Sequence, residues 1–504
     1  MTILSTKLND NLQELKKLLP SEDILTYSFE TEDAVSCAIL YADGVVNKQL
    51  LGDLIARPLS RLSLKKEGGR YASIEDFIEK SLLFPELKKA ENFTDASKEI
   101  LDGNSLLLID GVAVGFIVGA KLLPNRAVIE PPTDVAVKGP REGFIEDIKT
   151  NMALVRKRLK TPDLRFETVR VGKRSDTAVA LCWLQGTSNE KVKEELKKKI
   201  ESIQIDNIPD SSYIAALVSP RKNSLFRTLG TTEKPDVFTA KIVEGRVGVL
   251  VDGSPIALTA PYILTEDLQS SEDYFISPVM ATIFRFLRFI SLLVAILLPA
   301  FYVSAQLFKM QLLPLGLTLT IASSVRELPL SPSLEMFVVL LLLEVLKEAS
   351  IRMPKYVGMS LSVVGALVLG ETAVSAGFLS TPTIIIVAFS GICLYTVPNF
   401  VETGSILRWL FLLVSGSIGP FGIVLLLALV LYYLLSTDAF GAPLLSPFSP
   451  LTARDLKDAL IKYDLLSLNT RPRIFGSKNR TRLRLSKKEK EGGMSATKPK
   501  KGAS

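Results

Sequence analysis

The sequence predicts an α+β cytosolic region of two related α/β lobes, followed by a multi-pass α-helical transmembrane bundle. Three observations lead to this fold class. The chain has 504 residues, too many for one ordinary hydrophobic core. Short apolar runs alternate with charged helical stretches over residues 1–280, whereas long uncharged runs fill residues 285–437. A pattern that ends in Asp-Gly occurs twice in the first half, with an offset of 142 residues.

The composition argues against an enzyme. The chain has no histidine, which excludes Ser-His-Asp triads, HExxH zinc sites and imidazole pH switches. Neither a GxxxxGK[ST] nor a GxGxxG motif is present, and Cys37, Cys182 and Cys393 are too widely spaced for a zinc site. We therefore expect no catalytic residue, no metal, no cofactor, and three buried reduced thiols.

The net charge of +7 is unevenly distributed. Residues 471–504 carry 12 Lys or Arg and 2 Glu, a net charge of +10, which leaves −3 for the remainder. A basic tail next to a nearly neutral body is no sign of a nucleic-acid-binding fold. Anionic membrane lipids are the expected partner of the tail, and nucleic acid is not.

The expected domains follow the chain in order: an N-terminal leader (1–24), a first lobe (25–128), a linker with a helix (129–159), a second lobe (160–280), a transmembrane region (285–437) and a cytosolic basic tail (438–504). The repeat aligns residues 102–111 with 244–253, and Gly44 with Gly186. Asp-Gly between apolar runs predicts a tight hairpin, because both turn positions favour positive φ. Chance similarity between common hairpins is the alternative explanation.

The linker helix carries a run of basic residues, Arg156, Lys157, Arg158 and Lys160. Such a run is typical of a solvated face, and it is also compatible with a surface for anionic lipid head groups.

The second half contains four apolar spans, at residues 289–308, 357–378, 383–398 and 409–435. The first is uncharged over 20 residues, enough to cross a bilayer. The last is one tilted helix or a pair broken at Gly419-Pro420, and residues 312–324 resemble an interfacial or re-entrant piece. Arg285 and Arg288 place the start of the first span, and with it the N-terminal half, in the cytosol, and the basic residues at 347, 352 and 355 place the loop before Val357 there too. The number of crossings stays open between five and six.

The span 357–378 holds the candidate pore. One face carries small residues that allow close helix packing: Gly358, Ser362, Ala366 and Gly370. Another face carries the pore-lining candidates Ser360, Val364, Leu367 and Glu371. A carboxylate there could attract cations next to a hydrophobic constriction, and the alternative is a glutamate at the membrane boundary without a role in conduction.

A second group of charges surrounds the run 334–346. Its members form a candidate membrane charge network: Glu335, Glu344, Lys347, Glu348 and Arg352. Spacings of three and four residues place opposite charges on one helical face. The alternative is a helix end that emerges into water.

Several motifs occur in an order that resembles the A subunits of bacterial spore germinant receptors, the GerA family. They include EPPTDVAVKGPREGF, TEKPDVF, EGRVGVLVDGSP, EDYF, RFLRF, EVLKEASIRMP, VVGALVLGETAVSAG and APLLSPFSP. The residues that match the family motifs are Gly139, Pro140, Arg141, Glu233, Pro235 and Asp236. Lys234 replaces the arginine that the family usually has, which keeps the charge without the planar guanidinium.

The resemblance implies a multi-pass protein of the spore inner membrane. It implies a transporter-like B subunit and a lipoprotein C subunit as partners, and self-association as a pentamer into a nutrient-gated cation channel. The stage V sporulation AF relative has the same architecture, so a non-conducting scaffold or accessory protein that promotes ion release by its partners is the alternative.

Overall fold

The computed structural model describes residues 3–63, 87–121, 138–222, 224–325, 328–352, 354, 357, 363, 365 and 368–482. Within these residues the chain forms two compact units. The first comprises residues up to 263 together with 438–442 and 464–482, and the second comprises 264–437 and 443–463. The domain boundaries expected from the sequence stay predictions.

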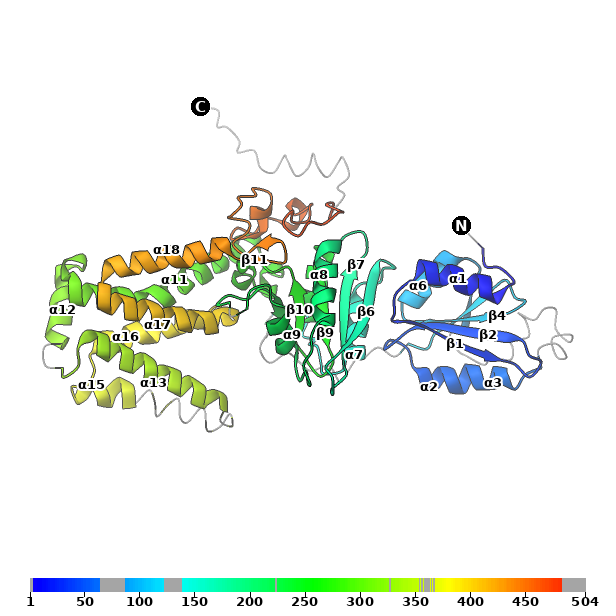
Figure 1. Cartoon of the computed structure of the whole chain (residues 1–504), viewed down its shortest axis with the longest axis horizontal. Coiled ribbons are helices and arrows are strands. Elements are labelled where there is room, and N and C mark those ends of the chain that lie inside the picture. The colour runs from blue at the N-terminus through cyan, green and yellow to red at the C-terminus, as the bar shows by residue number, and fades with distance from the viewer. Residues whose placement is uncertain are drawn as a thin grey trace, which may run out of the picture. The chain divides into compact units, whose positions relative to one another are not determined.

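The first unit contains two α/β lobes (Figure 1). The first lobe consists of α1 (Leu8–Leu18), β1 (Ile24–Glu30), β2 (Ser36–Ala42), α2 (Lys48–Leu51), the π-helical turn η1 (Gly52–Ala56), α3 (Arg57–Ser60), β3 (Leu87–Ala90), α6 (Phe93–Leu101), β4 (Ser105–Ile109) and β5 (Gly115–Val118). The second consists of α7 (Ile148–Arg158), β6 (Leu164–Val171), β7 (Thr177–Leu184), α8 (Glu190–Glu201), α9 (Ser211–Val218), β8 (Gly230–Thr232), α10 (Pro235–Val243), β9 (Val247–Val251) and β10 (Ala257–Ala260). The α/β character predicted for this part is confirmed.

The two sheets have the same topology. Their strand orders are β1-β2-β4-β5-β3 and β6-β7-β9-β10-β8, with antiparallel pairing between the neighbours. The register agrees as well, because Cys37 pairs with Ile109 and Val179, 142 residues further on, pairs with Val251. The offset seen in the sequence is thus the offset that relates the two sheets.

Each sheet is covered by helices on both faces. In the first lobe α1 and α6 cover one face and α2 with α3 the other (Figure 1). In the second lobe α7 and α10 cover one face and α8 and α9 the other. Alternate residues of the central strands therefore enter different cores: Cys37 and Ile39 face α2 and η1, whereas Ala38 and Leu40 face α1 and α6. Apolar burial on both faces explains the uninterrupted apolar runs of these strands.

The Asp-Gly turns perform the same task in both lobes. The Asp110 carboxylate accepts a hydrogen bond from the Leu8 N–H at 2.9 Å, and Asp252 accepts one from the Ile148 N–H at 3.3 Å. The glycines that follow, Gly111 and Gly253, have φ of +87° and +82°, which only glycine adopts at little cost. Each turn thereby fixes the start of a helix that covers its sheet.

All three cysteines are buried and unpaired, and two lie in the central strands β2 and β7. Burial raises the pKa of Cys37 to about 12, with a further contribution from the charge of Asp110, and burial also raises the pKa of Cys182. Because thiolates are the reactive form, we predict that the folded protein reacts with iodoacetamide at pH 8 far more slowly than the unfolded protein. Mass spectrometry of alkylated peptides measures this, and rapid labelling of Cys37 without denaturant would contradict it.

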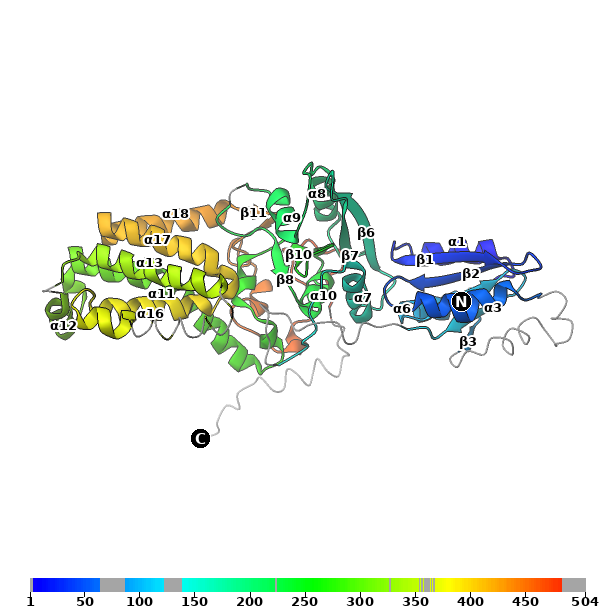
Figure 2. The ribbon, with the colours of Figure 1, turned by 90° about the horizontal axis from the view of Figure 1, so that it is seen from below.

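The second unit is mainly helical (Figure 2). Its elements are η3 (Leu264–Leu268), η4 (Ser271–Tyr274), α11 (Pro278–Phe308), η5 (Met310–Leu312), α12 (Leu315–Val325), α13 (Pro332–Arg352), the π-helical turn η6 (Val368–Thr372), α15 (Ala373–Ser375), α16 (Thr381–Tyr395), η7 (Pro398–Phe400), α17 (Val401–Ile418), α18 (Pro420–Ser436) and η8 (Asp455–Asp458). Among the described residues, Pro278–Phe308 and Pro398–Ile418 are long and apolar enough to cross a membrane, and α16 and α18 are shorter apolar helices.

The last apolar span is broken into two helices. Gly419 ends α17 with φ of +74°, and Pro420 begins α18 directly after it. The two helices pack side by side in both views (Figures 1 and 2), so the chain reverses direction here. Of the two alternatives for residues 409–435, the single tilted helix is wrong. A proline in a helix interior would lack a donor, whereas at the first position its missing N–H costs nothing.

Candidate functional site

The candidate pore is described only at one end. Glu371 lies in the π-helical turn η6 and is exposed, and a Cβ added to Gly370 would meet no atom within 4 Å. The remaining members of the two predicted faces lie outside the described residues: Ser360, Val364 and Leu367 of the pore-lining set, and Gly358, Ser362 and Ala366 of the packing set.

Two ion pairs occur at the predicted spacings on α13. Glu344 lies 3.3 Å from the Lys347 amine, and Glu348 lies 2.6 Å from the Arg352 guanidinium. The second pair is well exposed, with 59% and 78% of the side chains accessible, so it contributes little to stability.

Glu344 has a further partner that sequence reasoning missed. The Arg408 guanidinium, 1% exposed on α17, lies 2.7 Å from Glu344 and donates a hydrogen bond to the Ser390 hydroxyl at 3.3 Å. The Ser390 hydroxyl in turn donates to the Ala295 carbonyl at 2.7 Å. These contacts join α11, α13, α16 and α17. The sequence did offer one signal, because Arg408 is a charged residue inside an otherwise apolar stretch of α17. Charged residues in such stretches usually face the interior of a helix bundle and pair with an opposite charge there.

Glu335 does not join this network. It is fully buried near the start of α13, where its Oε1 atom accepts hydrogen bonds from the Ser380 N–H at 2.6 Å and the Ser380 hydroxyl at 2.7 Å. The five charges predicted as one network thus divide into a surface pair, a bundle cluster around Glu344 and an isolated carboxylate.

A stronger charge cluster lies around the first residues of α11. Asp273, fully buried in η4, binds both Arg285 at 3.1 Å and Arg288 at 2.8 Å. Arg285 also contacts Asp458 at 3.0 Å, and the Lys462 amine donates to the Asp273 carbonyl. We call Asp273, Arg285, Arg288, Asp458 and Lys462 the entry cluster. It connects η4 and α11 to residues 458–462, which follow the last helix in the sequence.

The electrostatics of the entry cluster favour an ionised Asp273. Burial alone would raise its pKa, but the hydrogen bond and charge of Arg288, the backbone N–H of Ser270 and the hydrogen bond from Arg285 together hold the pKa below its ordinary value of 3.8. The two arginines used above to orient the first span are therefore structural ion-pair partners as well.

The family motifs meet in the second lobe. Gly139, with φ of +117°, precedes Pro140 and Arg141 in a segment without helix or strand that leads to Phe144. The Phe144 N–H donates to the Glu233 carbonyl at 2.7 Å, and its ring packs edge-on against Phe238 at 5.5 Å between centroids.

Lys234, Pro235 and Asp236 lie at the start of α10. Pro235 occupies its first position, and the buried Lys234 amine lies 3.8 Å from Asp236. The two motifs are about 90 residues apart in the sequence, yet the segment that follows the first motif contacts the second motif in the second lobe.

The basic run of α7 does not form a solvated face. Arg156 is 2% exposed and holds Asp23 through two bonds of 2.8 and 2.9 Å, while Lys157 and Arg158 both pair with Glu142. The interpretation of Arg156 as a surface residue is wrong. Its buried guanidinium connects the first lobe to the helix that covers the second sheet.

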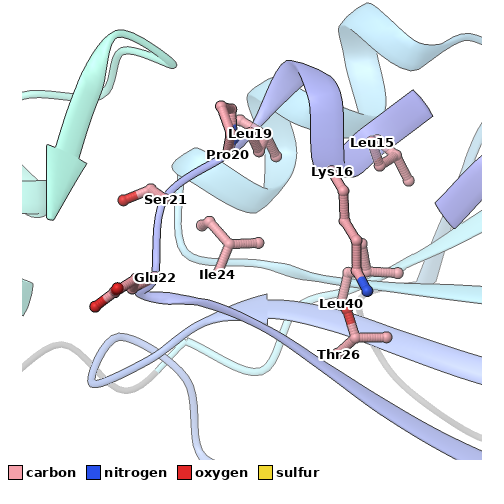
Figure 3. Close-up of a pocket in the computed structure, with 9 residues that line it drawn as sticks. All are labelled: Leu15, Lys16, Leu19, Pro20, Ser21, Glu22, Ile24, Thr26 and Leu40. Atoms are coloured by element: carbon pink, nitrogen blue, oxygen red, sulfur yellow. The ribbon is translucent and has the colours of Figure 1, made fainter. Parts of the chain in front are cut away.

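A cavity of about 320 Å³ lies at the end of α1 in the first lobe (Figure 3). Its lining is largely apolar: Leu15, Lys16, Leu19, Pro20, Ser21, Glu22, Ile24, Thr26 and Leu40. Figure 3 shows the Lys16 side chain reaching from α1 toward Leu40 and Thr26. No predicted site residue lines this cavity.

Comparison with known proteins identifies the family. A family model described as Bacillus/Clostridium GerA spore germination protein matches residues 10–474. The chain belongs to this family. The resemblance to the GerA family that the motifs indicated is thereby confirmed, and several relatives are named as spore germination proteins.

Relatives of this GerA-family chain match over most of its length. Spore germination protein KA of Bacillus subtilis (strain 168) is 32% identical over 95% of this chain and 89% of the relative. The uncharacterized membrane protein YfkQ of the same organism is 32% identical over 94% and 93%, and spore germination protein B1 is 31% identical over 93% and 97%. The crystal structure of the N-terminal domain of the A subunit of the Bacillus megaterium spore germinant receptor GerK3 matches 52% of this chain and 98% of that chain, with 30% identity and a TM-score of 0.42.

Proposed function

We propose that this GerA-family chain is the A subunit of a spore germinant receptor, and that it oligomerises into a nutrient-gated cation channel that triggers germination. The observation that carries the proposal is the family match over residues 10–474, with relatives named as spore germination proteins over nearly their full length. The proposal places the protein in the spore inner membrane as a multi-pass protein with its N-terminal lobes in the cytosol. Its partners are a transporter-like B subunit, a lipoprotein C subunit and other copies of itself, as a pentamer.

The pore in this proposal is built from residues 357–378 of each copy. A single chain cannot enclose a pore with one such helix, so oligomerisation is part of the mechanism. The exposure of Glu371 supports this geometry, because a carboxylate on an open helix face can join its equivalents around a common axis. Leu367 and Val364, about one and two helical turns before it in the sequence, would form the hydrophobic constriction that closes the pore.

A non-conducting accessory role is the second candidate. YfkQ, which matches this chain as well as protein KA does, is named only as a membrane protein. In this role the two α/β lobes would cluster other receptor proteins, and the partners would release the ions.

Reconstitution separates the two candidates. We expect liposomes that contain the full-length protein with its B and C partners to release K⁺ on addition of nutrient. Val364→Ala should release K⁺ without nutrient, Glu371→Gln should slow the efflux several-fold, and Glu348→Gln, which removes an exposed charge of the surface pair, should leave it unchanged. Oligomers that form in detergent but never conduct would favour the accessory role.

A further inference from the structure

The helical unit contains a cluster of buried polar side chains that the proposed pore does not use. Its members come from α11, the start of α13 and the start of α16. Glu335 is 0% exposed, and Tyr302 and Gln306, 4% and 9% exposed, lie one turn apart on the same face of α11. Tyr302 packs in the same core as Met336, the neighbour of Glu335, and α11 contacts both α13 and α16.

Several polar atoms in this cluster have no hydrogen-bond partner within the described part of the chain. They are the Oε2 atom of Glu335, the Tyr302 hydroxyl and both polar atoms of the Gln306 amide. Buried polar groups of folded proteins are otherwise almost always satisfied, and each exception calls for a physical reason. Three of these atoms are oxygens that can accept or coordinate, and they point to a shared ligand within an apolar bundle.

The charge of this polar cluster defines the ligand. The other acidic residues of α13 have basic partners, but Glu335 takes part in none of the ion pairs among the described residues. Its Oε1 atom is satisfied by Ser380, and the positive ends of α13 and α16 offset part of its negative charge. One carboxylate charge is fully balanced by one monovalent cation, whereas a divalent ion would leave an unpaired positive charge in an apolar environment.

We propose that Glu335, Tyr302 and Gln306 bind a dehydrated alkali cation, Na⁺ or K⁺, between α11, α13 and α16. The ligands are the free carboxylate oxygen of Glu335, the phenol oxygen of Tyr302 and the amide oxygen of Gln306. All are oxygen donors, as hard cations require. The Thr383 hydroxyl, fully buried beside Ser380, lies within reach of the same space.

The bound cation connects three helices, so it would stabilise the bundle and couple its packing to the ions of the surroundings. This inference concerns binding within one chain and does not rest on conduction. A protein that never conducts in liposomes could still show the cation dependence described next, so the two proposals fail separately.

The test uses the full-length protein in detergent with its thermal unfolding recorded in KCl or NaCl, and choline chloride holds the ionic strength constant. We expect KCl or NaCl to raise the midpoint in a saturable way, by about 5 °C at a hundredfold excess over the dissociation constant. Glu335→Gln keeps an acceptor for Ser380 but loses the charge, so it should abolish this rise. Tyr302→Phe, which removes one oxygen, should weaken the apparent affinity about tenfold or more.

Glu348→Gln on the same helix is the matched control and should retain the full rise. A wild-type midpoint that is equal in KCl, NaCl and choline chloride would overturn the proposal, since the polar cluster would then bind water or a proton instead of a cation. A cation-dependent rise that persists in Glu335→Gln would also overturn it, because the ion would then bind elsewhere.

Discussion

Arg156→Ala is expected to lower the apparent melting temperature of the purified full-length protein by about 10 °C. The Arg156 guanidinium binds Asp23 through two bonds and also donates to the Ser21 hydroxyl and to the carbonyls of Thr161 and Leu164. Both members of the pair are 2% exposed. Removing the arginine leaves Asp23 as an uncompensated buried charge, which typically costs about 3–5 kcal/mol.

Two further variants separate this ion pair from a general effect of removing an arginine. Arg174→Ala is the matched control, because Arg174 is 84% exposed and lies 3.6 Å from Asp206, so its removal should change the midpoint only slightly. The double variant Asp23→Leu, Arg156→Met should be more stable than Arg156→Ala, because it leaves no buried charge unpaired. A midpoint of Arg156→Ala within one or two degrees of wild type would contradict this structural role.

The second large effect is expected for Asp273→Asn. The substitution keeps the shape of the side chain but removes the negative charge between Arg285 and Arg288. Arg285 is fully buried and would keep Asp458 as its acidic partner among the described residues, together with the carbonyls of Asp458 and Ala459. We expect a loss of about 3 kcal/mol and increased proteolytic cleavage of residues 443–463, measured by limited trypsin digestion of the intact protein. Asp438→Asn, which changes an exposed side chain, is the control.

The pH dependence of the entry cluster follows from the direction of the Asp273 shift. Because the folded pKa lies below 3.8, the carboxylate contributes stability above about pH 4, and this contribution is lost as the pH falls through the folded pKa. The cluster should therefore not respond to pH changes between 5 and 8. Asp273→Asn should lower the midpoint equally at pH 5 and pH 8, and an effect confined to one of them would contradict this assignment.

The repeat was predictable because its signals are local. Asp-Gly turns favour positive φ, and the structure gives φ of +79°, +87° and +82° at Gly44, Gly111 and Gly253; Gly186, which aligns with Gly44 but follows Gln185, has φ of +74°. Apolar strands between such turns specify a sheet from neighbouring residues alone. These signals did not predict the strand order. The edge strands β3 and β8 are short, and a helix and a strand separate each of them in the sequence from the strand with which it pairs.

The buried charges could not be predicted from spacing. Arg156 lies in a basic run that is typical of a solvated helix face, and its partner Asp23 is 133 residues away. Arg408 and Glu344 are 64 residues apart. Pairs at three or four residues on one helix are visible in a sequence, whereas a long-range pair depends on how helices pack. For the same reason the sequence did not indicate that Glu335 would take part in none of the ion pairs among the described residues.

The reversal at Gly419 bears on how crossings are counted. Pro398–Phe400 lies against Leu264–Leu268, which bonds through Leu264 to Leu444, so the chain enters this hairpin and leaves it at the same end of the helical unit. The hairpin therefore adds an even number of crossings, two or none, to any topology. If the helical unit spans a membrane as proposed, the side from which residues 443–463 emerge is set by the helices before Pro398, and a protease-protection or cysteine-accessibility map can concentrate on those helices.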